Sequence, residues 1–199
     1  MIYREQIEWC DTWIEAAGEE TKPRVLLIGD SITRSYYPHV RSQLAERYAC
    51  ARIATSKCVA DPAFFKELGI VLSEYRFSII HFNNGLHGWS YDENAYRSGL
   101  ARAFDEFVAY CGAAHVIWGT TTPVWKKDDS TTMDDKTERV RERNKIAAAL
   151  AHDRGIYIND LFSEIVNRSN LVSADGVHLL EEGQILLGKC VAEAVQKIQ

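Results

Sequence analysis

Short apolar runs alternate with longer amphipathic stretches along this chain of 199 residues. The run at 24–29 is apolar after its arginine and ends in glycine, which is typical of a strand buried on both faces of a parallel sheet. Similar runs predict strands at 77–82, 115–119 and 155–158, and a weaker run predicts one at 48–54.

Helical periodicity fills the intervals between these strands. The first predicted helix, 2–17, rests on apolar residues near one face: Ile7, Trp9 or Cys10, Trp13 and Ile14. Asp61 and Pro62 are typical first-turn residues and predict a helix continuing over 63–75. Further helices are predicted at 93–110, 136–153 and 180–198. This alternation predicts an α/β protein whose parallel sheet is covered by helices on both faces.

The length and the lack of a visible linker or repeat favour a single domain over 1–199. A net charge of −5 argues against a large basic surface for nucleic acid or anionic lipid. No apolar run is long enough for a membrane span, and the charged N-terminus does not resemble a signal peptide. We therefore expect a cytoplasmic protein, although removal of a leader would leave the same sequence. The five cysteines lack metal-ligand or disulfide spacing, so reduced thiols are expected.

Chemically suggestive residues follow the first predicted strand. Gly29, Asp30 and Ser31 stand where ligands bind in parallel sheets, outside the carboxyl ends of the strands. Glycine allows a sharp bend, and a serine opening the next helix lies near N–H groups that stabilise negative charge. Ser31 is thus a candidate nucleophile. For this tripeptide alone, a plain helix cap by Ser31 or Asp30 is the commoner explanation.

A second candidate pair precedes the last predicted helix. Asp175 and His178 are three residues apart, so the carboxylate can bind imidazole Nδ1 and leave Nε2 to take a serine proton. A capped helix start with a solvent-exposed histidine explains the same residues equally well.

Taken together, the two segments resemble the SGNH (GDSL-type) hydrolases over nearly the whole chain, from Arg24 to the final helix. The resemblance implies a three-layer α/β/α sandwich with a flavodoxin-like sheet of five parallel strands. It also implies hydrolysis through an acyl-enzyme on Ser31. His178 would be the general base and then acid, and Asp175 would orient it.

Two other segments depart from the family pattern. The family usually has an oxyanion-hole glycine after the second strand, but 54–61 contains none; Ser56 and Lys57 are candidates for substrate contact there, with a solvated Lys57 as the alternative. After the third strand the family has Gly-x-Asn-Asp, whose asparagine donates to the oxyanion. Aligned on Gly85, His87 takes that place, and Asn84 is a second candidate donor. Turn-forming asparagines and a structural histidine remain alternatives.

The polar stretch after the fourth strand, 120–133, is either a substrate-facing flap or a surface loop. Trp89, Tyr91 and Trp125 are candidates for stacking on a sugar or lining an acyl pocket, with core packing as the alternative.

These residues predict a serine esterase that hydrolyses a small acyl group. The family resemblance favours O-acetyl groups on carbohydrate. Two alternatives stay open, namely a non-catalytic ligand-binding protein on the same fold and an acyltransferase. This chemistry needs no metal or organic cofactor. The expected partner is a small-molecule or carbohydrate ester, not nucleic acid or a membrane, and the oligomeric state stays open.

Overall fold

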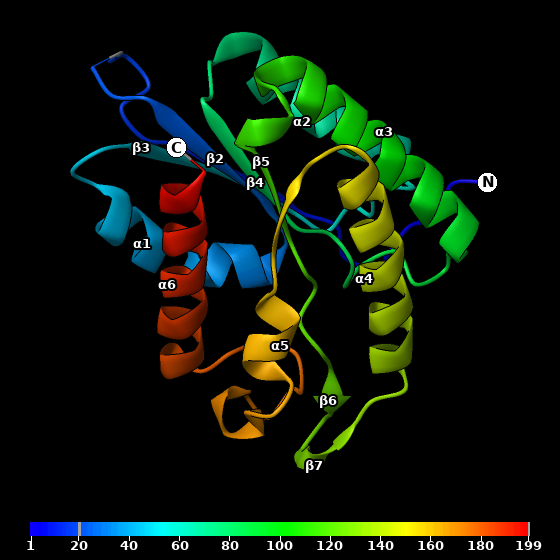
Figure 1. The fold of residues 1–199 in the computed structure, drawn as a ribbon. Helices are drawn as coiled ribbons and strands as arrows, with labels where there is room; N and C mark the ends of the chain where they lie inside the picture. The colour runs from blue at the N-terminus through cyan, green and yellow to red at the C-terminus, as the bar shows by residue number, and fades with distance from the viewer. Residues whose placement is uncertain (20, 199) are drawn as a thin grey trace.

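A six-stranded sheet in the order β1-β3-β2-β4-β5-β8 forms the centre of the computed structural model, which describes residues 1–19 and 21–198 (Figure 1). Its strands are β1 (Cys10–Ile14), β2 (Arg24–Gly29), β3 (Ala49–Thr55), β4 (Ile79–Phe82), β5 (Val116–Gly119) and β8 (Tyr157–Asn159). All but β1 pair in parallel, which confirms the predicted flavodoxin-like sheet of five parallel strands. β1 adds an antiparallel strand at the edge, beside β3.

The helix predicted at 2–17 is wrong. Residues 10–14 are instead strand β1, whose register with β3 runs from Cys10 opposite Thr55 to Ile14 opposite Ala51. Pairing with β3 satisfies backbone groups that would otherwise be left along the edge of the parallel sheet. The residues Thr12, Trp13 and Ile14 also favour strand conformation, because β-branched and aromatic side chains fit a pleated surface.

Helices cover both faces of the sheet, which confirms the three-layer arrangement (Figure 1). One face carries α1 (Ser31–Leu44), α5 (Leu161–Ile165) and α6 (Glu181–Lys197), and the other carries α2 (Pro62–Glu74), α3 (Glu93–Cys111) and α4 (Lys136–Asp153). Val25 and Leu27 of β2 belong to the first apolar cluster, while Leu26 belongs to the second. Successive residues of a strand face opposite sides, so the uniformly apolar run serves two cores.

The local start signal of α2 is confirmed, since Asp61 accepts a hydrogen bond from Ala63 N–H and Pro62 opens the helix. Between β5 and α4, the strands β6 (Trp125–Lys126) and β7 (Asp129–Met133) form a hairpin. The remaining elements are the 3₁₀ turns η1 (Ala113–His115) and η2 (Ser169–Leu171). Among the helices of the described residues, none has the length and apolar character needed to cross a bilayer.

Candidate active site

Ser31 is the first residue of α1, directly beyond the end of β2. Asp30 caps this helix, because its Oδ1 accepts the Ile32 N–H at 2.9 Å. The turn needs glycine before it, since a Cβ on Gly29 would lie 2.0 Å from Thr33 Oγ1. Capping therefore falls to Asp30, and the Ser31 hydroxyl is available for another partner.

The turn at 175–178 presents a carboxylate and an imidazole three positions apart in the sequence. Asp175 Oδ1 accepts three hydrogen bonds, from Ser173 Oγ at 2.8 Å, Val177 N–H at 2.8 Å and His178 N–H at 2.9 Å. Gly176 has φ of 78°, a left-handed conformation that suits glycine. These contacts fix the carboxylate and leave its other oxygen, Oδ2, for the His178 ring.

Ser31, His178 and Asp175 form one hydrogen-bonded chain. The Ser31 Oγ lies 2.8 Å from His178 Nε2, and His178 Nδ1 lies 2.7 Å from Asp175 Oδ2. When Nδ1–H donates to the carboxylate, Nε2 of the neutral ring accepts the serine O–H. The structure thus joins in one line three side chains that are up to 147 positions apart in the sequence.

The electrostatics of Asp175 favour a permanent negative charge. Partial burial by itself would raise its pKa, but hydrogen bonds from Val177 N–H, the His178 ring, His178 N–H and Ser173 outweigh it. The net effect holds the pKa of this carboxyl well below its usual range. The side chains of Asp175 and His178 are each 48% exposed, so the imidazole is open to a bulky substrate.

The hairpin β6–β7 packs against this turn rather than standing free. Trp125 N–H donates to Gly176 O at 2.8 Å, and Asp128 N–H donates to Ala174 O at 2.7 Å. A cavity of about 260 Å³ lies between the hairpin and residues 172–176. The stretch predicted as a flap or surface loop therefore buttresses the turn that carries Asp175.

Of the aromatic candidates, Trp125 and Tyr91 are buried in the apolar clusters, and Trp89 is partly buried against one of them. Arg139 and Arg143 lie over the Trp89 ring, 5.5 and 4.9 Å from its centroid.

Three of the predicted substrate-contacting side chains are held by other parts of the protein. The Asn84 amide accepts Val59 N–H at 3.1 Å and donates to Lys57 O at 2.9 Å, so it clamps the loop after β3. Lys57 Nζ is paired with Glu8. Ser56 Oγ accepts Trp9 N–H at 3.0 Å.

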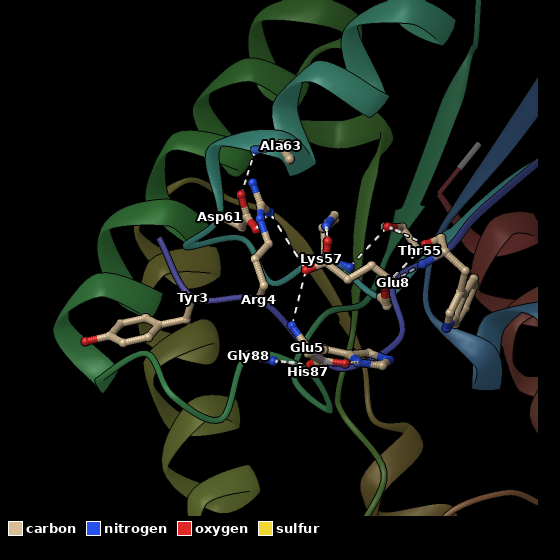
Figure 2. A network of polar contacts seen from close by, with 12 residues as sticks. Tyr3, Arg4, Glu5, Glu8, Thr55, Lys57, Asp61, Ala63, His87 and Gly88 are labelled. Carbon is tan, nitrogen blue, oxygen red and sulfur yellow. Dashed lines mark hydrogen bonds and ion pairs between the residues drawn. The ribbon is translucent and has the colours of Figure 1, made fainter. Parts of the chain in front are cut away.

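His87 is held by a carboxylate that the sequence did not suggest. Its Nδ1 lies 2.9 Å from Glu5 Oε2, and the other oxygen of Glu5 accepts Gly88 N–H at 3.0 Å (Figure 2). In a neutral ring whose Nδ1–H donates to Glu5, Nε2 carries no proton. That form of His87 accepts hydrogen bonds at Nε2 and cannot donate one to an oxyanion.

Glu5 belongs to residues 3–9, a segment here called the N-terminal strap. The strap lies across the loops that follow β3 and β4 (Figure 2). Arg4 pairs with Asp61, and Ser56 N–H donates to Trp9 O at 3.1 Å. The prediction of a helix at 2–17 did not anticipate the strap, because the contacts of the strap are with residues far away in the sequence.

Arg143 of α4 is another residue that the sequence did not single out. Its side chain is fully buried, and it donates to Gly85 O at 3.0 Å, His87 O at 2.8 Å and Gly88 O at 3.2 Å. It is also paired with Glu93 at 3.0 Å. The guanidinium therefore fixes the backbone of the loop that presents His87. An arginine in the middle of an amphipathic helix was the only available signal.

Two backbone N–H groups, at the start of α1 and in the loop after β3, have no hydrogen-bond acceptor in the described part of the chain and are candidates for an oxyanion hole. The first N–H groups of a helix have no carbonyl within it, and Ser31 opens α1. In the loop after β3, the Cys58 N–H has no hydrogen-bond acceptor within residues 1–19 and 21–198. β3 lies directly beside β2, with Ala54 opposite Gly29, so this loop leaves the sheet next to Ser31.

The chain has the α/β/α fold of the SGNH hydrolases. An acetyl xylan esterase, AlAXEase, superposes with a TM-score of 0.70 at 18% identity, covering 86% of this chain and 99% of that chain. Axe2, an acetylxylan esterase from Geobacillus stearothermophilus, gives 0.67 at 14% identity, covering 87% and 94%. Est24, a carbohydrate acetylesterase from Sinorhizobium meliloti, gives 0.67 at 16% identity, covering 89% and 100%. Scans of protein-family models and of curated proteins found no match.

Proposed function

We propose that this protein is a serine esterase that removes small acyl groups, O-acetyl first among them, from a carbohydrate or other polyol. The observation that carries the proposal is the continuous contact from Ser31 Oγ through the His178 ring to Asp175 Oδ2, with both distances below 3 Å. A serine hydroxyl is a weak nucleophile until an adjacent base takes its proton, and this arrangement supplies that base.

In the proposed reaction, Ser31 Oγ attacks the ester carbonyl carbon while His178 Nε2 takes the hydroxyl proton. The Ser31 and Cys58 N–H groups donate to the developing oxyanion. His178 then gives its proton to the departing alkoxide, which leaves an acyl group on Ser31. Water attacks that acyl group while His178 takes its proton; His178 then returns the proton to Ser31 Oγ as the carboxylic acid is released. Asp175 holds the tautomer and stabilises the imidazolium in both steps.

Two further observations support a carbohydrate ester as substrate. The half-exposed imidazole suits an acyl group carried on a bulky alcohol better than a small, enclosed ligand. The structural neighbours named above include enzymes described as acetylxylan esterases and a carbohydrate acetylesterase.

Hydrolysis of p-nitrophenyl acetate and of a mono-O-acetylated methyl glycoside by wild type and by Ser31→Ala tests the proposal. We expect Ser31→Ala to lose at least about 10³-fold in kcat, as triad removal does. A fluorophosphonate probe should label wild type and not the variant. Equal rates and equal labelling for the two proteins would refute the esterase assignment. Acetyl transfer to added glycerol in preference to water would identify an acyltransferase instead.

A further inference from the structure

The carboxylate–imidazole pair of Glu5 and His87 resembles in geometry the pair formed by Asp175 and His178. In each pair a carboxylate oxygen lies within 3 Å of Nδ1, at 2.9 Å and 2.7 Å respectively. A carboxylate–imidazole pair like that of the proposed triad thus occurs a second time. It lies at the same end of the sheet, since His87 follows β4 and Ser31 follows the neighbouring strand β2.

Glu5 uses both oxygens at this point, which defines the hydrogen-bonding pattern of the His87 ring. Oε1 accepts Gly88 N–H at 3.0 Å and also lies 3.1 Å from His87 Nδ1, while Oε2 lies nearer to Nδ1, at 2.9 Å. A carboxylate only accepts hydrogen bonds, so the neutral ring must carry its proton on Nδ1. Nε2 is left as an acceptor, and the side chain of His87 is 19% exposed, so it reaches solvent.

A line of ring contacts connects His87 to the helix of the nucleophile. The Trp9 ring packs edge-to-face with the His87 ring at 6.2 Å between centroids. The guanidinium of Arg34 lies over the same indole, 5.0 Å from its centroid. Arg34 is three residues after Ser31 on α1, and residues at that spacing are neighbours on a helix surface. The N-terminal strap therefore lies next to the part of α1 that carries Ser31.

We propose that Glu5 is a positioning residue that sets His87 as a hydrogen-bond acceptor for a free hydroxyl of the substrate alcohol. This inference rests on the esterase function proposed above and deepens it, because it selects esters of partly acylated polyols such as sugars. It replaces the oxyanion-donor role predicted for His87 from the sequence, since the neutral ring has no Nε2 proton to give. Within the N-terminal strap, Glu5 alone then acts on the substrate site, through His87.

Glu5→Gln gives a sharp test because it reverses the polarity of His87. The amide oxygen can still accept Gly88 N–H, and the amide NH₂ then faces Nδ1 and donates to it. Because the NH₂ takes the place of Oε2, the oxygen nearer to Nδ1, we expect the ring proton to move to Nε2, which changes from an acceptor to a donor. The ratio of kcat/KM for the mono-O-acetylated methyl glycoside to that for p-nitrophenyl acetate, which has no hydroxyl, should fall about tenfold or more.

Three comparisons separate this role from a merely structural one. Glu8→Gln carries the same substitution on the same strap but faces Lys57, so the substrate ratio should stay within about twofold of wild type. In a His87→Ala background, Glu5→Gln should change the ratio no further. Long-range ¹⁵N–¹H spectra near pH 9, where histidines are neutral, should show the Nδ1–H tautomer of His87 in wild type and the Nε2–H tautomer in Glu5→Gln.

The outcomes distinguish this inference from the esterase proposal. A Glu5→Gln ratio equal to wild type, with Ser31→Ala inactive, overturns the role of Glu5 and His87 alone. An equal loss on both substrates, or an Nε2–H tautomer already present in wild type, also overturns it. If wild type and Ser31→Ala hydrolyse every ester at the same rate, the esterase proposal and this inference fall together.

Discussion

Replacing Arg143 by methionine should destabilise the protein strongly. Methionine retains much of the arginine's apolar length but removes the donors to Gly85 O, His87 O and Gly88 O. Breaking a buried ion pair typically costs about 3–5 kcal/mol. The lower end applies here because Glu93 is 26% exposed and keeps a second partner, Arg139, at 2.6 Å. We therefore expect a loss of about 3 kcal/mol in the free energy of unfolding.

Urea unfolding followed by circular dichroism measures this loss directly, provided that the m-values of the two proteins agree. For a chain of this size, about 3 kcal/mol corresponds to a fall of roughly 6–12 °C in Tm. Arg141→Met is the matched control on the same helix. Its side chain is 44% exposed and its partner Glu138 is 81% exposed, so we expect a loss below about 1 kcal/mol.

The refuting result is a stability of Arg143→Met within about 1 kcal/mol of wild type, or no lower than that of Arg141→Met. Either would mean that water or neighbouring donors satisfy the three carbonyls once the guanidinium is gone. Arg143→Lys provides a further check. One ammonium group cannot reproduce the planar fork that serves three carbonyls and Glu93, so most of the loss should remain.

The remaining predictions concern the turn at 175–178. Asp175→Asn should lower kcat for p-nitrophenyl acetate about 10⁴-fold; Ser173→Ala, which removes one of three donors to the same oxygen, should lower it less than about tenfold, and similar losses would contradict the orienting role. Gly176→Ala should cost about 1–3 kcal/mol in urea unfolding, because φ is 78° and the new Cβ would lie 2.2 Å from Trp125 O; an unchanged midpoint would refute this strain. Because the folded-state pKa of Asp175 is lowered, its carboxylate stabilises the folded protein fully at pH values above the ordinary pKa of 3.8. This stabilisation is lost as the pH falls through the folded-state pKa. The stability advantage of wild type over Asp175→Asn should therefore shrink from about pH 5 to pH 2, and a constant difference would count against it.

The sheet was predictable because its strands carry strong local signals. The run at 24–29 has to be apolar on both faces, and the structure divides its side chains between two cores. The helix at 136–153 matches α4 residue for residue, since a long amphipathic period leaves few alternatives. The serine and the aspartate–histidine pair were detectable because each is local, lying in a turn directly after a strand or before a helix.

The N-terminal region was not predictable in the same way. Apolar residues at 7, 9 or 10, 13 and 14 fit a helical period, yet the hydrogen-bonding edge of β3 decides the conformation of 10–14. Glu5 and His87 are 82 positions apart, and no local pattern links them. The same holds for Arg143, whose three acceptors are backbone carbonyls and so leave no signature in side-chain identity.

These long-range contacts all fix the loops that follow β3 and β4. The polar groups of Asn84 and Arg143 form hydrogen bonds with backbone atoms of the two loops beside Ser31, so neither side chain is available to substrate. The strap then adds Glu5 beside His87, whose side chain still reaches solvent. His87, held by Glu5, can offer a fixed hydrogen-bond acceptor to a ligand. Asn84 cannot, because its amide is bonded to the backbone of the loop after β3. The departures from the family pattern at 54–61 and at His87 are therefore connected, because the strap that ties down the first also orients the second.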